Sequence, residues 1–134
     1  MSGEIVSGEI IALAERFFRA IEKADVAAIR AIYAPDARIW HNFDDKEQTV
    51  EENLRVLDWV TRTISNRHYR VLRRETFPGG FLQQHVLEGD LPDGTKYRLP
   101  ACIVCTVKDG RITRLDEYLD SHGTKALSAF ARSR

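Results

Sequence analysis

Three ionisable side chains in this sequence stand among apolar neighbours: His41, His85 and Glu117. Glu117 alternates with Leu115 and Leu119 in a stretch typical of a β-strand, so these three side chains share one face. A carboxylate on an apolar face is costly unless a partner hydrogen-bonds to it, and an imidazole is a suitable partner. Because histidine titrates near neutral pH, this combination of residues can transfer protons.

His85 lies in a comparable setting on another predicted strand. It shares a face with Leu87 and Phe81, and Gln83 interrupts that apolar series. We therefore expect a largely apolar pocket that holds a few polar groups, which is the usual composition of a small-molecule site. Besides the three ionisable residues, six are predicted to line it: Tyr33, Ile39, Gln83, Leu87, Leu115 and Leu119.

The residue types suggest a division of roles in this pocket. We expect His41 to take a proton from a carbon acid or a water while Glu117 orients it, and His85 to donate to the developing oxyanion. The ligand would be a small apolar molecule, and no cofactor is needed. Two alternatives stay open. The polar groups form a structural network or line the wet cavity of a non-catalytic binding module, or they bind a metal through two histidines and one carboxylate. No short ligand motif supports the metal site, so no metal is predicted.

Three helices are predicted before the long strands. The first begins near Ser7, and its apolar residues recur at spacings of three and four. Asp25 is placed to cap a second, shorter helix. Thr49 and Glu52 have the spacing of a capping box and open the third, which runs to about Ser65.

The chain after Asn66 has the pattern of successive strands. The turn signals "PGG", "LPDG" and "KDG" recur at hairpin spacing, and Asp109-Gly110 suits a turn in which both central residues need positive φ. The expected sheet is therefore mainly antiparallel. With the helices on one face of a long curved sheet, the fold class is α+β. The amphipathic segment "TKALSAF" is expected to close the open end.

Composition limits the function classes. The chain has 134 residues, 43% of them apolar and 30% charged, which predicts a single domain over residues 1–134 with no membrane span. Net charge is zero and no basic face is visible, so nucleic acid is not an expected partner. No secretory signal is recognisable at the start, and a cytoplasmic location is expected. Cys102 and Cys105 point to opposite faces of one strand, so both are expected to be reduced.

Other prominent side chains have simpler interpretations. Trp40 lies on the strand face opposite His41 and is predicted to pack at a subunit interface, while Trp59 is expected on a helix surface or in a dimer contact. His68 and His122 are predicted to be solvated loop residues. The strand "LPACIVCTV" is apolar on both faces and needs a cover away from the helices, which predicts a homodimer.

The order of helix, helix, strand, helix and four antiparallel strands resembles the nuclear transport factor two superfamily. Three stretches carry the resemblance: "YAPDARIWHN", "QHVLEGDLPDGT" and "VKDGRITRLDEYLD". It extends from about Glu9 to Asp120. The resemblance implies a conical, cystatin-like α+β barrel, shared with ketosteroid isomerase, limonene epoxide hydrolase and the SnoaL-like polyketide cyclases. It implies an isomerase, a cyclase or a hydrolase of SnoaL-like type.

The resemblance also implies places for site residues. The general base of ketosteroid isomerase lies on the strand after the helical hairpin, and the match puts His41 there, with Ile39 on the same inward face. The epoxide hydrolases use an arginine and an aspartate two apart, and a further aspartate near the end. The matching residues here are Gln83, His85 and Glu117. That arginine–aspartate pair is absent, and the first helix has no tyrosine to serve as an oxyanion donor. The resemblance therefore implies neither epoxide hydrolysis nor steroid isomerisation.

Overall fold

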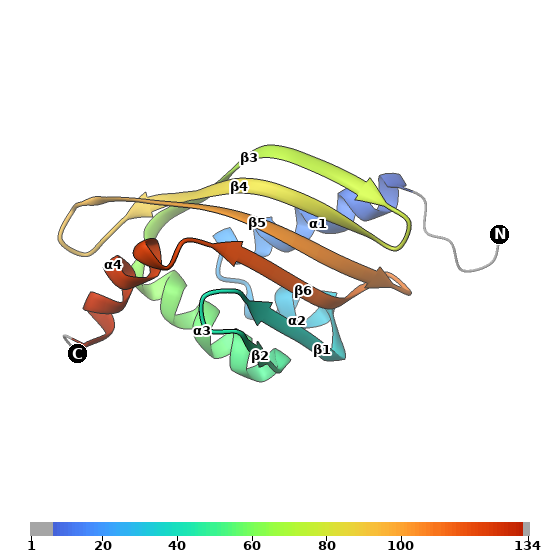
Figure 1. Cartoon of the computed structure of the whole chain (residues 1–134), viewed down its shortest axis with the longest axis horizontal. Coiled ribbons are helices and arrows are strands. Elements are labelled where there is room, and N and C mark those ends of the chain that lie inside the picture. Colours follow the sequence, from blue (N-terminus) through green and yellow to red (C-terminus); the bar gives the residue numbers. More distant parts are fainter. Residues whose placement is uncertain (1–6, 133–134) are drawn as a thin grey trace.

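The computed structural model describes residues 7–132, which form four helices and six strands (Figure 1). The helices are α1 (Ser7–Glu22), α2 (Val26–Ile32), α3 (Val50–Thr63) and α4 (Ser121–Arg132). The strands are β1 (Tyr33–His41), β2 (Lys46–Gln48), β3 (Ser65–Phe77), β4 (Gly80–Asp90), β5 (Lys96–Lys108) and β6 (Arg111–Leu119).

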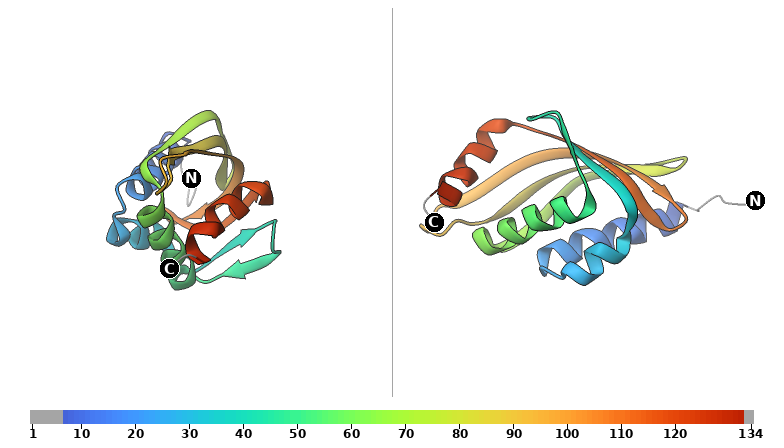
Figure 2. Two further views of the ribbon diagram at one scale, coloured as in Figure 1. Left: turned by 90° about the vertical axis from the view of Figure 1, so that its left-hand side faces the viewer. Right: turned by 90° about the horizontal axis from the view of Figure 1, so that it is seen from below.

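All six strands belong to one sheet in the order β2-β1-β6-β5-β4-β3. β1 and β6 are parallel, and every other neighbouring pair is antiparallel. Figure 2 shows the sheet curving over one side of the molecule while α1, α2 and α3 cover the other, with α4 across one end. The sheet does not close on itself. The predicted α+β class, with helices on the concave face of a mainly antiparallel sheet, is confirmed.

The predicted helix caps are present. The side chain of Asp25 accepts a hydrogen bond from Ala28 N at 3.1 Å, which satisfies a free donor at the start of α2. At α3, Thr49 N donates to the Glu52 carboxylate at 2.8 Å and Glu52 N donates to the Thr49 hydroxyl at 3.2 Å. This reciprocal pair is the capping box that the sequence predicts. The helix ends two residues earlier than expected, because Ser65 already belongs to β3.

The turn between β5 and β6 also follows the sequence. Asp109 has a φ of 54° and Gly110 a φ of 76°, the left-handed pair that this hairpin turn requires. Two other features were not predicted. The short strand β2 pairs with the end of β1, and His68 and His122 lie in β3 and α4. The prediction that these two histidines are loop residues was wrong, although both are exposed.

Two hydrophobic clusters hold the helices to the sheet. The larger one joins the buried faces of α1 and α2, including Phe17 and Ile29, to the inner face of the sheet. The smaller one lies at the other end and includes Leu99 of β5 and Leu127 of α4. A β-carbon at Gly123 would overlap the end of the Leu99 side chain, so a larger residue there would displace that side chain where α4 approaches β5. α4 thus closes this end, as expected for the amphipathic segment. No helix within residues 7–132 is long and apolar enough to cross a membrane.

Candidate functional site

A cavity of about 270 Å³ lies between the inner face of the sheet and the helices α1, α3 and α4. Its walls are mainly apolar, with rings and aliphatic side chains from both hydrophobic clusters. Within residues 7–132, no lysine or arginine lines the cavity, and Glu117 is the only carboxylate that does. Phe43 and Val56 line the cavity and are also exposed, so its opening lies between the β1–β2 turn and α3.

His41 and Glu117 meet inside this cavity. They are register partners in the parallel pairing of β1 with β6, and His41 Nε2 lies 3.0 Å from Glu117 Oε1. Their side chains are only 11% and 21% exposed. Asn42 N donates to the Glu117 carbonyl at 3.0 Å, which continues the strand pairing just past His41. The contact between histidine and carboxylate that strand alternation suggested is therefore present.

Both nitrogens of the His41 ring are withdrawn from the ligand space. Nε2 faces Glu117, and Nδ1 is buried without a hydrogen-bond partner among the described residues. Burial opposes protonation of the ring, but the hydrogen bond and charge of Glu117, helped by Asp44, raise the pKa of His41 above its usual value. The Glu117 carboxylate makes no hydrogen bond within residues 7–132 beyond the one to His41, so its second oxygen is available to a ligand.

His85 lies on the neighbouring part of the inner face, on β4. The rings of Phe18 and Tyr69 approach it edge-on, with centroids at 5.4 and 4.9 Å. Burial is the main cause that lowers the pKa of His85, so the neutral ring is favoured. Its Nδ1 is 2.8 Å from the amide nitrogen of Gln83. Gln83 is not among the lining residues, contrary to the prediction, because its fully buried side chain is held between Arg74 and His85.

The other predicted lining residues reach the cavity: Tyr33, Ile39, Leu87, Leu115 and Leu119. Tyr33 is buried, and its hydroxyl donates to Asn53 Oδ1 at 2.9 Å. Asn53 Nδ2 in turn donates to Gln48 Oε1 at 3.1 Å. Sequence reasoning missed Asn53 and Gln48. The available signal was that Asn53 is an amide next to Leu54 on the buried stripe of α3.

Trp59 was placed wrongly from the sequence. It lines the cavity from α3, and its indole Nε1 is buried without a hydrogen-bond partner among the described residues. The residue has no special spacing in the helical pattern, and it packs against the smaller hydrophobic cluster, which includes Leu99 and Leu127. Thr124 and Ser128 of α4 add two hydroxyl groups to the same end of the cavity.

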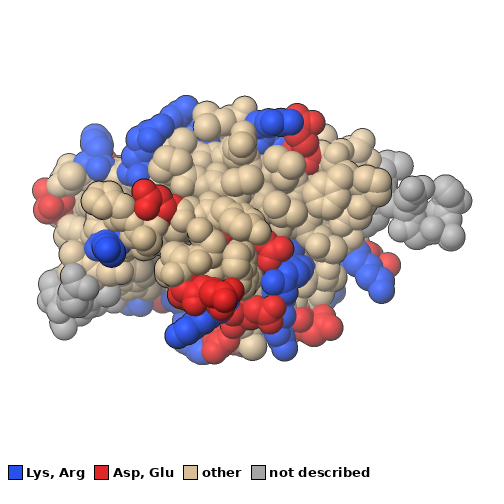
Figure 3. Space-filling view, in the orientation of Figure 1, with Lys and Arg blue, Asp and Glu red and all other residues tan. Residues whose placement is uncertain are grey.

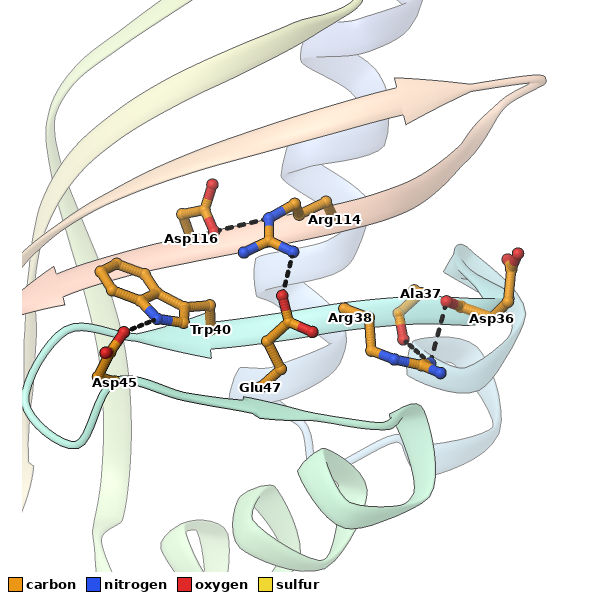
Figure 4. Close-up of polar contacts among 8 residues, drawn as sticks. All are labelled: Asp36, Ala37, Arg38, Trp40, Asp45, Glu47, Arg114 and Asp116. Atoms are coloured by element: carbon orange, nitrogen blue, oxygen red, sulfur yellow. Dashed lines mark hydrogen bonds and ion pairs between the residues drawn. The ribbon is translucent and has the colours of Figure 1, made fainter.

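Trp40 points away from the cavity, on the outer face of the sheet. Its indole Nε1 donates to Asp45 at 2.8 Å (Figure 4). Its ring packs edge-on against that of Tyr118. On the same face, the Arg114 guanidinium bridges the carboxylates of Glu47 and Asp116 at 2.7 and 2.9 Å. Alternation along β1 therefore separates an inward histidine from an outward tryptophan, as predicted. In the part of the chain that the structure describes, no three histidine, cysteine or acidic side chains are grouped closely enough to hold a metal ion.

Residues 14–115 match the family model of the SnoaL-like domain. No curated protein sequence matches the chain. Among solved structures, AclR from Streptomyces galilaeus, a candidate hydroxylase, has a TM-score of 0.81 at 12% identity and covers 92% of this chain and 98% of its own. IdmH from Streptomyces antibioticus, a candidate polyketide cyclase, has a TM-score of 0.77 at 17% identity. It covers 89% of this chain and 97% of its own.

A third solved structure has a ketosteroid isomerase-like fold and comes from Catenulispora acidiphila, in complex with trimethylamine. It has a TM-score of 0.74 at 15% identity and covers 87% of this chain and 92% of its own. At these identities the three likenesses establish a shared fold.

Proposed function

The chain belongs to the SnoaL-like domain family, and from this premise we propose that its cavity is the active site of an enzyme that transfers protons on a small, neutral carbonyl compound. The observation that carries the proposal is the His41–Glu117 pair, 3.0 Å apart inside a largely apolar cavity. A paired carboxylate with one free oxygen is suited to take a proton from a carbon acid.

In this proposal Glu117 is the base and His41 orients it. This reverses the roles expected from the sequence. Neither ring nitrogen of His41 is open to a ligand, whereas one oxygen of Glu117 is. The hydrogen bond from His41 fixes the carboxylate in one orientation, which reduces the reorganisation that proton transfer requires.

The reaction begins at a carbon next to the carbonyl group. Glu117 takes a proton from that carbon, and the electron pair of the broken C–H bond moves into the carbonyl group to form an enolate. His85 donates a hydrogen bond to the enolate oxygen, where the negative charge develops. Return of the proton to a different carbon gives an isomer. Attack of the enolate carbon on a second carbonyl of the same molecule closes a ring instead: the π bond of that carbonyl opens to an alkoxide, which takes the proton back from Glu117.

The charges around the cavity favour a neutral substrate. A ligand carboxylate or phosphate would lose its hydration, meet Glu117 and find no lysine or arginine among the lining residues. A volume of about 270 Å³ suits a small molecule. The candidate cyclase assignment of IdmH agrees with ring closure, and that of AclR shows that the same fold is associated with other chemistry.

Exchange of carbon-bound hydrogen for deuterium tests the proposal directly. The protein is incubated in D₂O with a panel of enolisable ketones and lactones, and NMR follows loss of the proton next to the carbonyl. Glu117→Gln should reduce exchange by at least about 100-fold, the typical contribution of a positioned base. Glu47→Gln, on the outer face, is the matched control and should retain wild-type exchange.

The alternative is a non-catalytic module of the same fold that binds small molecules. The hydroxyl groups of Thr124 and Ser128 on the cavity wall favour it, because they can accept hydrogen bonds from a ligand and have no role in the proposed proton transfer. The two functions separate when binding is measured beside exchange. A ligand that stabilises the wild-type protein against heating but never exchanges supports the module. Exchange lost in Glu117→Gln with binding retained supports the enzyme.

A further inference from the structure

Three hydrogen-bonded side chains connect the edge strand β3 with the cavity. Arg74 Nε donates to Gln83 Oε1 at 2.7 Å, and Gln83 Nε2 lies 2.8 Å from His85 Nδ1. Gln83 is fully buried and His85 is 2% exposed. Arg74 and Gln83 are register partners across β3 and β4, so the strand pairing itself holds the first contact.

Chemistry fixes the direction of each hydrogen bond among these three side chains. A guanidinium has donors and no acceptor, so the Gln83 atom that faces Arg74 is its carbonyl oxygen. The amide nitrogen then faces His85, and it can only donate. His85 Nδ1 must therefore accept, which means that it carries no proton. The proton of the neutral ring resides on Nε2. A reversed amide would place donor against donor at Arg74 and leave a buried oxygen without its strongest partner.

The surroundings of Arg74 keep these three side chains hydrogen-bonded in this order. Its side chain is largely buried, and its nearest carboxylate is that of Glu15 on α1, at 3.9 Å. An arginine stays charged in proteins, so its donors are always present. The charged groups around His85 act in opposite directions. Burial, together with Arg74, lowers the pKa of His85, while Glu117 acts to raise it.

Gln83 stands between Arg74 and the cavity, so the arginine does not contact a ligand. The cavity side of the His85 ring carries Nε2, since Nδ1 is turned to Gln83. We propose that Arg74 is a positioning residue of this site: acting through Gln83, it holds His85 as the neutral Nε2–H tautomer. The cavity then offers the oxygen of a neutral carbonyl ligand a fixed, uncharged donor. That use of the donor rests on the proposed function, whereas the tautomer itself does not.

The ring nitrogens of His85 report the tautomer directly. Long-range proton–nitrogen NMR spectra of the ¹⁵N-labelled protein distinguish a protonated ring nitrogen from an unprotonated one. At pH 7 we expect His85 to show an unprotonated Nδ1 and a protonated Nε2. A wild-type spectrum with the proton on Nδ1, or with both nitrogens protonated, would overturn the proposal whatever the variants do.

Substitutions test the part that Arg74 plays. Arg74→Met frees the Gln83 amide to turn, so His85 should become a mixture of tautomers. Gln83→Glu supplies only acceptors and should move a proton to Nδ1. Arg74→Lys restores a donor and should restore the wild-type pattern in part. Arg73→Met, at an exposed neighbour that pairs with Glu75, is the control and should leave the pattern unchanged. A wild-type pattern in Arg74→Met would refute the role of Arg74.

The same samples separate this inference from the proposed function. Deuterium exchange should fall about 10-fold or more in Arg74→Met, while the His41–Glu117 contact and the fold remain as in wild type. If wild-type protein shows the Nε2–H tautomer but exchanges no substrate, the tautomer stands and the enzyme proposal fails. If wild-type protein exchanges substrate but carries the His85 proton on Nδ1, the enzyme proposal stands and the inference about Arg74 fails. Backbone amide spectra confirm that each variant is folded.

Discussion

His41 and Glu117 are 76 residues apart in the sequence but directly opposite each other in the parallel pairing of β1 and β6, with Nε2 and Oε1 separated by 3.0 Å. The pair joins the first long strand to the last one. Because the two strands are neighbours in the sheet, the pair depends on the whole fold rather than on either segment alone. Its titration is therefore a measure of both site geometry and tertiary structure.

Removing the carboxylate should lower the pKa of His41. Burial opposes the charged ring, and Glu117 outweighs burial in the wild-type protein. In Glu117→Gln the burial stays and most of the attraction is lost. A proton NMR titration of the His41 ring measures the change, with Glu47→Gln as a control that should leave it unaffected. Equal His41 titrations in wild type and Glu117→Gln would contradict the pairing.

The same pair predicts how stability changes with pH. The pKa of His41 in the folded protein lies above the ordinary value of 6.5, so the folded state binds a proton that the unfolded state releases. This contribution is fully present below pH 6.5 and is lost as pH rises through the folded-state pKa. The variant His41→Gln keeps a donor but does not titrate there. The wild-type advantage in free energy of unfolding should shrink with rising pH in urea denaturation. A difference in free energy of unfolding between wild type and His41→Gln that does not change with pH would contradict the raised pKa of His41.

Tyr33→Phe tests the hydrogen bonds that connect Tyr33, Asn53 and Gln48 beside α3. The substitution removes the donor to Asn53 Oδ1, a buried oxygen with no other donor among the described residues. Leaving it unpaired should cost about 1–3 kcal/mol in free energy of unfolding. Tyr118→Phe, on the outer face, should change stability by less than about 0.5 kcal/mol. Urea denaturation measures both, and equal costs for the two variants would mean that the buried hydrogen bond adds nothing.

The outer face of the sheet is proposed as the contact of a homodimer. Figure 3 looks onto this face, where charged side chains gather at the margins and few lie over the middle. Val104 of β5 and Tyr118 of β6 are on this face, and Tyr118 is 48% exposed. Sedimentation at micromolar concentration should show a dimer, and Val104→Arg should give a folded monomer. A wild-type monomer would contradict the proposal.

Local patterns were enough for much of this molecule. The capping box of Thr49 and Glu52, the Asp109-Gly110 turn and the inward face of His41 each depend on residues within a few positions of one another. Alternation gives the face of a strand but not how far the cavity extends along it. Gln83 therefore shares a strand face with His85, but only His85 reaches the cavity.

The residues that were missed depend on contacts distant in sequence. Trp59 packs against a cluster that combines Leu87 of β4, Leu99 of β5 and Leu127 of α4, and no short pattern encodes those contacts. In the sequence, Arg74 is one residue of the charged run "RRE" and has no other distinguishing feature. Its pairing with Gln83 depends on the register between β3 and β4, which a bulge between Val71 and Arg73 shifts by one residue.

The placement of Phe43 at the cavity opening links ligand exchange to the state of the acid–base pair. Phe43 follows His41 by two residues, and its ring centroid is 5.6 Å from that of the histidine. Because Phe43 packs against the His41 ring, a ligand that displaces Phe43 also changes the surroundings of the His41–Glu117 pair. Contact of a ligand with this part of the cavity wall is thereby coupled to the electrostatics of the pair.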